Sequence, residues 1–114
     1  MAGGFSAEVT SLEEAANKAL RPLAAELLDA RSRLADTRYS DIGFTAGQYD
    51  EDGIFAPAGS AWDETRGFLE RIFADNAENL LLAAAALLEI AQRYRQADQG
   101  AAANLQAIEN QGLG

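Results

Sequence analysis

The sequence contains no cysteine and no histidine, and only two prolines and one tryptophan in 114 residues. Without cysteine there is no disulfide framework and no thiol nucleophile. Without either residue type, the Ser-His-Asp and Cys-His catalytic arrangements and nearly all zinc sites are excluded. The remaining carboxylates, hydroxyls and basic groups are poor material for catalysis. We therefore expect a protein that is not an enzyme, with no catalytic, cofactor-binding or metal-binding residues.

Positive charge and long apolar runs are also scarce. Nine Lys and Arg residues stand against 18 Asp and Glu residues, a formal net charge of −9, which disfavours nucleic acid and anionic membranes as partners. The most apolar stretch, residues 80–88, is far shorter than the ~20 residues of a membrane span. The first residues lack the basic and apolar regions of a Sec signal peptide. We expect a soluble protein made in the cytoplasm without a Sec leader.

The apolar residues that are present favour helices. The chain has 25 Ala and 14 Leu but only 5 Ile and 1 Val. Ala and Leu have high helix propensity, whereas the β-branched residues that favour strands are nearly missing. The length suits one small domain. The predicted fold is all-α, an antiparallel helical hairpin of two long helices joined by a long loop.

The first helix is predicted over about residues 6–38. Apolar residues recur there in steps of three and four from Val9 to Leu34, which places them on one stripe of a helix. Pro22 interrupts this pattern, because it has no amide hydrogen and its ring crowds the preceding turn. Since the apolar stripe continues on both sides, we expect a kink or short break near residues 19–21 and not the end of the helix.

The second helix is predicted over about residues 60–99, with Ser60 as its N-cap and Gly100 as its stop. Residues 39–59, which lack periodicity and contain four glycines and a proline, are predicted to be a partly ordered loop. Residues 100–114 are predicted to be a flexible tail. The segment 101–108 is expected to become helical against a partner.

The second helix is apolar around its whole circumference, because residues 80–82 and 87–88 are leucines and residues 83–86 are alanines. One partner helix covers only one stripe, so we predict a dimer, homotypic or heterotypic, in which two hairpins form a four-helix bundle. The alternative is that the alanine faces are simply exposed to water. The predicted partner interface comprises Phe68, Ile72, Leu80, Leu81, Ala84, Leu87, Leu88 and Ala91.

Two features suggest recognition by other proteins. Tyr94 and Asp98 form a Y-x-x-x-D pattern near the predicted end of the second helix, and this spacing puts both side chains on one face. The alternative is that Tyr94 only packs in the apolar core and that Asp98 is only a solvated surface residue. Trp62 lies where the loop enters the second helix, and its alternative role is a packing anchor.

Acidic clusters offer little support for a metal site or for catalysis. Residues 50–53 read Asp-Glu-Asp-Gly, but this run lacks the alternating ligands and the distal Glu of an EF-hand. Glu70, Asp75 and Glu78 have no recognisable basic or metal partner. We assign neither cluster a function.

Together, the hairpin pattern, Trp62 and the Y-x-x-x-D pattern resemble the WXG superfamily of type VII (ESX) secretion substrates. The segment GSAWDETRGFLERIFADNAENLLLAAAALLEIAQRYRQADQGAAA resembles in particular its EspC-like, ESX-secretion-associated branch. The resemblance covers nearly the whole chain, although its motifs are short. The W-x-G tryptophan corresponds to Trp62, and Glu64 stands where that motif has glycine.

The resemblance implies a non-enzymatic protein that is secreted as a folded dimer, with Tyr94 and Asp98 as the signal read by the type VII secretion ATPase. It also implies a targeting role, in which the chain binds a WXG-like hairpin such as the helical N-terminal region of a larger toxin. The alternative function is a cytosolic helical adaptor, chaperone or immunity-type protein that is not exported.

Overall fold

The computed structural model describes residues 2–44 and 55–112 of the chain, and every described element is helical. The order is α1 (Ala2–Glu14), a π-helix η1 (Ala15–Leu20), α2 (Arg21–Asp36), a 3-10 helix η2 (Thr37–Phe44) and α3 (Ala56–Gly112). The predicted all-α helical hairpin is therefore confirmed. No strand occurs in the part of the chain that the structure describes, as expected for a sequence so poor in β-branched residues.

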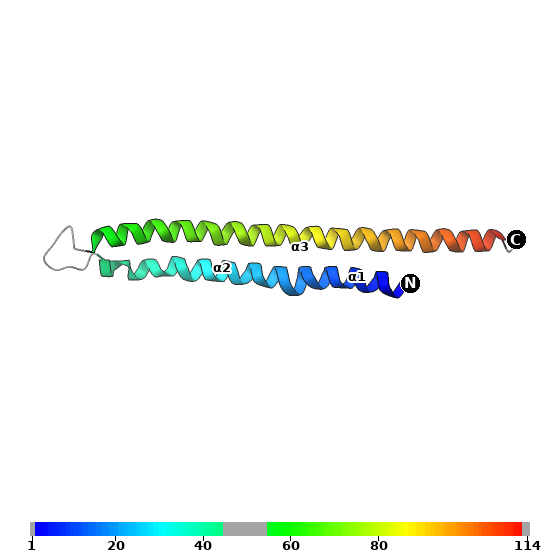
Figure 1. Cartoon of the computed structure of the whole chain (residues 1–114), viewed down its shortest axis with the longest axis horizontal. Helices are drawn as coiled ribbons and strands as arrows, with labels where there is room; N and C mark the ends of the chain where they lie inside the picture. Colours follow the sequence, from blue (N-terminus) through cyan, green and yellow to red (C-terminus); the bar gives the residue numbers. More distant parts are fainter. Residues whose placement is uncertain (1, 45–54, 113–114) are drawn as a thin grey trace. The chain divides into compact units, whose positions relative to one another are not determined.

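The chain divides into two compact units, and each pairs α3 with an earlier helix. Unit 1 comprises Met1–Arg21 and Leu81–Gly114, and unit 2 comprises Pro22–Leu80. In unit 1, α1 lies antiparallel to the C-terminal part of α3 (Figure 1). In unit 2, α2 lies antiparallel to the N-terminal part of α3.

The irregularity predicted near Pro22 is found as the π-helix η1, which begins before residue 19. The amide of Arg21 donates to the carbonyl of Ala16, five residues earlier. This wider turn absorbs one extra residue. The buried positions Val9 and Ala16 are seven residues apart, whereas Ala16 and the next buried position, Ala24, are eight apart. The extra residue in the turn accounts for the burial of small side chains on both sides of Pro22.

The region between the predicted helices is more helical than expected. Residues 37–44 form η2, and α3 begins at Ala56, so that Ser60 lies inside the helix and is not its N-cap. Pro57 occupies the first turn of α3, where its missing amide hydrogen has no cost. Residues 45–54, the middle of the predicted loop, lie outside the described residues. A Cβ at Gly59 would lie 2.7 Å from Cβ of Phe44, so glycine allows η2 to approach α3 closely.

Residues 100–112 of the predicted flexible tail are also helical. α3 continues through Gly100 to Gly112, so the helix does not stop at residue 99. A glycine inside a helix costs about 1 kcal/mol relative to alanine, and three alanines directly after Gly100 favour continuation. All side chains described from residue 92 to residue 112 are exposed. This end of α3 is therefore not held by burial of its own side chains.

Candidate interaction surface

Small side chains fill the buried apolar positions of both units. In unit 1 the buried apolar residues are Val9, Ala16, Ala84 and Ala91, and in unit 2 they are Ala24 and Ala77. On α3 the three alanines are seven residues apart, which keeps them on one stripe of the helix. Alanine at such positions lets two helix backbones approach closely. The hairpin therefore buries mainly methyl groups along its seam.

Large apolar side chains are left partly in water. In unit 1, Leu81 and Leu82 are 44% and 62% exposed, and in unit 2, Phe68 and Ile72 are 54% and 47% exposed. Each unit thus presents apolar surface that its own two helices do not cover. Exposed apolar surface of this kind on a small domain is characteristic of interaction sites. These residues define a candidate interaction surface on each unit, which also includes the exposed side chains of Leu23 and Leu28 in unit 2 and of Ile90, Leu105 and Ile108 in unit 1.

The predicted partner interface agrees with this surface only in part. Phe68, Ile72 and Leu81 are exposed, whereas Leu80, Leu87 and Leu88 are half-buried. Ala84 and Ala91 are 0% and 1% exposed. These two alanines are covered by the chain itself, so a partner cannot reach them and their assignment to the interface is wrong. The helix face with small apolar side chains packs inside the hairpin, and the larger apolar side chains of α3 lie outside this contact.

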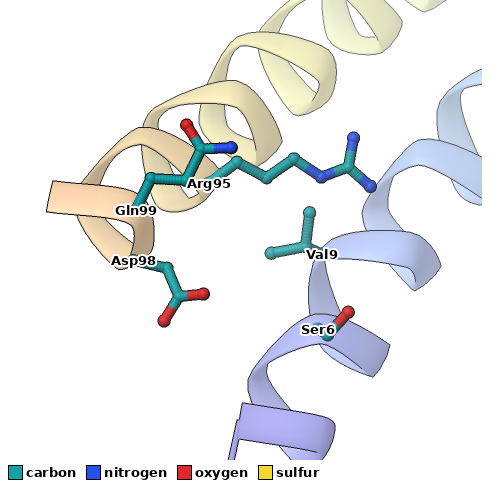
Figure 2. A pocket seen from close by; sticks show the side chains of 5 residues that line it. All are labelled: Ser6, Val9, Arg95, Asp98 and Gln99. Carbon is teal, nitrogen blue, oxygen red and sulfur yellow. The ribbon is translucent and has the colours of Figure 1, made fainter. Parts of the chain in front are cut away.

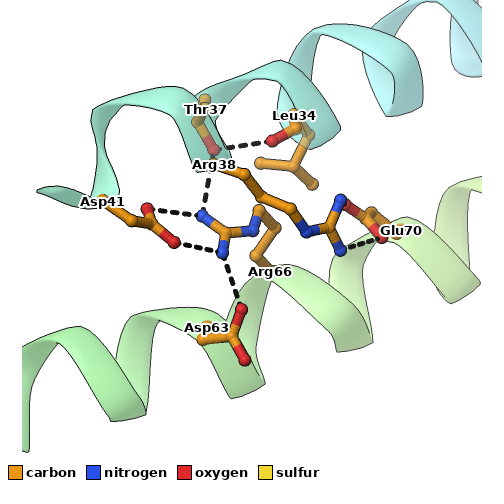
Figure 3. Close-up of polar contacts among 7 residues, drawn as sticks. All are labelled: Leu34, Thr37, Arg38, Asp41, Asp63, Arg66 and Glu70. Carbon is orange, nitrogen blue, oxygen red and sulfur yellow. Dashed lines mark hydrogen bonds and ion pairs between the residues drawn. The ribbon is translucent and has the colours of Figure 1, made fainter.

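A charged cluster in unit 2 joins η2 to α3 around Arg66, whose side chain is 1% exposed (Figure 3). Its Nη1 and Nη2 donate to the two carboxylate oxygens of Asp41 at 2.7 and 2.5 Å, and Nη2 also donates to Asp63 at 2.7 Å. Thr37 lies on the same side and donates its hydroxyl hydrogen to the carbonyl of Leu34 at 2.6 Å. A bidentate pair of this geometry fixes one register between the two helices.

The cluster shifts the pKa of both charged partners toward the ionised forms. The hydrogen bond from Arg66 lowers the pKa of Asp41 below its ordinary value of 3.8, and burial opposes this effect. The hydrogen bond to Asp41 raises the pKa of Arg66, with a further contribution from Asp63. Burial disfavours the charged forms and so opposes both shifts, but for both groups it is a smaller effect than the Arg66–Asp41 hydrogen bond.

Trp62 is half-buried and belongs to the same cluster. The guanidinium carbon of Arg66 lies 5.7 Å from the centre of the Trp62 ring, within the range of a cation–π contact. Trp62 and the exposed Glu64 both lie inside α3, which begins at Ala56. The helix therefore begins earlier than the junction that was predicted at Trp62. The role of Arg66 was not predicted from the sequence, because nothing local in the sequence marks its contact with Asp41, 25 residues away.

The Y-x-x-x-D residues lie on the exposed part of α3 in unit 1. Tyr94 is 48% exposed and Asp98 is exposed. Asp98 lines a pocket of about 190 Å³ with Ser6, Val9, Arg95 and Gln99 (Figure 2). The sequence predicted that this pattern lies near the end of the helix. That prediction is wrong, because α3 continues to Gly112. Both side chains nevertheless lie on an accessible helical surface.

Of the acidic residues considered in the sequence analysis, Glu70 has a structural partner, Asp75 and Glu78 are exposed, and residues 50–53 lie outside the described residues. Glu70 accepts one hydrogen bond from Nη2 of Arg38 at 2.9 Å and forms an ion pair with Nη1 of the same guanidinium at 2.8 Å. Within 2–44 and 55–112, no three acidic side chains gather in a way that would hold a metal ion. In the same ranges, no helix has a stretch long and apolar enough to cross a membrane.

Comparison with known proteins adds no relatives: no family model, no curated protein and no solved structure matches this chain.

Proposed function

We propose that this chain is a non-enzymatic helical interaction protein of a type VII (ESX) secretion system. It assembles with a second helical hairpin into a four-helix bundle. In this assembly it is exported as a folded dimer, acts as a targeting partner for the helical N-terminal region of a larger substrate such as a toxin, or does both. The observation that carries the proposal is that small residues fill the seam of each unit while the larger apolar side chains stay exposed.

The energetics of burial support an assembly. Covering an exposed Leu, Ile or Phe side chain completely is worth about 1.5–3 kcal/mol, and α3 alone offers Phe68, Ile72, Leu81 and Leu82 at 44–62% exposure. A stable interface buries about 800 Å² on each partner. The single chain exposes 8583 Å² in total, so such an interface needs only about a tenth of its surface. The apolar flanks of the hairpin suit that requirement.

Assembly is tested by replacing Ile72 with aspartate. We expect Ile72→Asp to weaken association at least about tenfold, because a carboxylate in place of a half-exposed isoleucine opposes desolvation of the interface. The measurement is sedimentation velocity of the protein alone and of the complex purified after co-expression with the products of neighbouring genes. Gln92→Glu, which adds the same charge at an exposed polar position of α3 outside the proposed interface, is the control. A folded wild-type monomer at micromolar concentration in both preparations contradicts the proposal.

Export is tested at Tyr94 and Asp98. The wild-type protein should appear in the culture medium of an actinobacterial host only when its type VII secretion ATPase is intact. We expect Tyr94→Ala or Asp98→Ala to abolish export and leave assembly unchanged, because both exposed side chains lie four residues apart on one helix face. Gln92→Ala, an exposed neighbour on the same helix, should be exported normally. Immunoblots of the medium and the cells measure the result.

The second candidate function is a cytosolic helical adaptor, chaperone or immunity-type protein. The same exposed apolar flanks favour it, because they fit any helical partner. The two functions differ in export: a protein that forms the complex but never reaches the medium is an adaptor.

A further inference from the structure

One ion pair links the outer part of α3 to α1 in unit 1. Nη1 of Arg95 donates to Oε2 of Glu13 at 2.9 Å, and the other carboxylate oxygen also contacts this guanidinium. Figure 2 shows the Arg95 side chain reaching from α3 toward α1 beside Val9. The two residues are 82 positions apart in the sequence. The pair therefore restrains the distance between two helices and not a local turn.

This ion pair lies where burial no longer holds α3. The last buried side chain on α3 is Ala91, and from residue 92 to residue 112 every described side chain is exposed. Opposite this region, Val9 is the one buried residue of α1 among its described side chains, and it lines the pocket with Arg95 and Asp98. Segments with few buried contacts open locally at low free energy. A polar link between the two helices there has a direct effect on local opening.

We propose that Arg95 is a positioning residue for the Tyr94–Asp98 signal. Its ion pair with Glu13 holds the turn that carries both signal residues in helical form against α1, and the secretion machinery reads the signal in this docked form. Arg95 itself need not contact the machinery. The inference rests on the proposed secretion function and adds the regulation of its signal: opening of this turn away from α1 weakens recognition.

The test compares two ion pairs made by neighbouring arginines of α3 with different partners. Arg95 connects α3 to α1, whereas Arg93 pairs with Glu89 at 2.8 Å within α3. Partly exposed pairs contribute modestly, so we expect Arg95→Gln to speed amide hydrogen exchange in residues 92–99 by about two- to fivefold. Arg93→Gln is the matched control, and it should leave the exchange of the N-terminal helix, residues 6–14, unchanged. Arg95→Gln should speed exchange in that helix as well.

Charge-reversal variants decide whether the Glu13–Arg95 ion pair itself causes the effect. Glu13→Arg and Arg95→Glu each place like charges together and should reduce both protection of residues 92–99 and export. The double variant restores the opposite charges and should recover both. Recovery identifies an effect of the pair, since neither side chain is then the original one and the two signal residues are untouched.

Three results overturn the inference, and one of them also concerns the proposed function. The first is equal exchange in Arg95→Gln and Arg93→Gln, which shows that the link to α1 holds nothing. The second is export that stays normal in the single reversals although exchange is accelerated, which shows that the docked form is not what is read. The third is absence of the wild-type protein from the medium, which rejects the secretion function itself, while the exchange data still decide whether Arg95 holds the turn.

Discussion

Replacing Ala84 with leucine is expected to lower the free energy of unfolding by about 1–3 kcal/mol. Ala84 is completely buried in unit 1 and lies midway in the series Ala77, Ala84 and Ala91. Small side chains at these positions permit the close approach of two helices. Three additional heavy atoms have no space in such a seam, so the helices must separate or the side chain must adopt a strained rotamer.

Urea denaturation followed by circular dichroism measures this effect, at a fixed protein concentration because association would contribute to stability. Ala85→Leu is the matched control, since it adds the same atoms to an exposed position one residue away. Its effect should stay within about 0.5 kcal/mol. Equal destabilisation by the two substitutions would show that the alanine series is not the seam of the hairpin.

Replacing Asp41 with asparagine is expected to lower the thermal midpoint at neutral pH by about 5 °C, since one charged hydrogen-bonded pair is lost in a small domain. The two carboxylate oxygens of Asp41 accept hydrogen bonds from the two terminal nitrogens of Arg66. Asparagine has similar shape but no charge, and its amide nitrogen cannot accept a hydrogen bond. Among the described residues, Arg66 would then keep one full ionic partner, Asp63, whose side chain is 67% exposed.

The pH dependence gives this prediction a second signature. The pKa of Asp41 is lower in the folded state than its ordinary value of 3.8, so its contribution to stability is present above that value. The contribution is lost as pH falls through the folded-state pKa. Wild type should therefore lose more stability than Asp41→Asn on acidification below about pH 4.

Thermal melts at neutral pH and at about pH 2 measure both quantities. Asp36→Asn removes an exposed carboxylate of α2 and should leave the neutral-pH midpoint unchanged. A difference between wild type and Asp41→Asn that is as large at acidic pH as at neutral pH would contradict a role for the Asp41 charge.

The sequence predicted much of the secondary structure, because that part depends on local properties. The abundance of Ala and Leu gave the helical class, and the interrupted apolar stripe at Pro22 gave an irregular turn that the structure realises as η1. Glu89 and Arg93 stand four residues apart, the spacing of an ion pair along one helix, and they form that pair. Propensity, proline geometry and i,i+4 spacing act within a few residues.

Helix ends were predicted less well, because single capping or breaking residues have small effects. Ser60 and Gly100 have the residue types of an N-cap and a stop, yet α3 passes through both. The preference involved is about 1 kcal/mol at each position. Helix-forming neighbours on both sides outweigh it.

The sequence by itself determined that this protein is a set of helices with apolar stripes on both long segments, since periodicity fixes which side chains share a face. Only the tertiary structure decided which stripe is covered. Ala84 and Ala91 pack within the chain, Leu81 and Leu82 stay exposed, and Arg66 pairs with Asp41. The physical reason is that burial and charge pairing depend on the helix that lies opposite, and residues far apart in the sequence supply that neighbour.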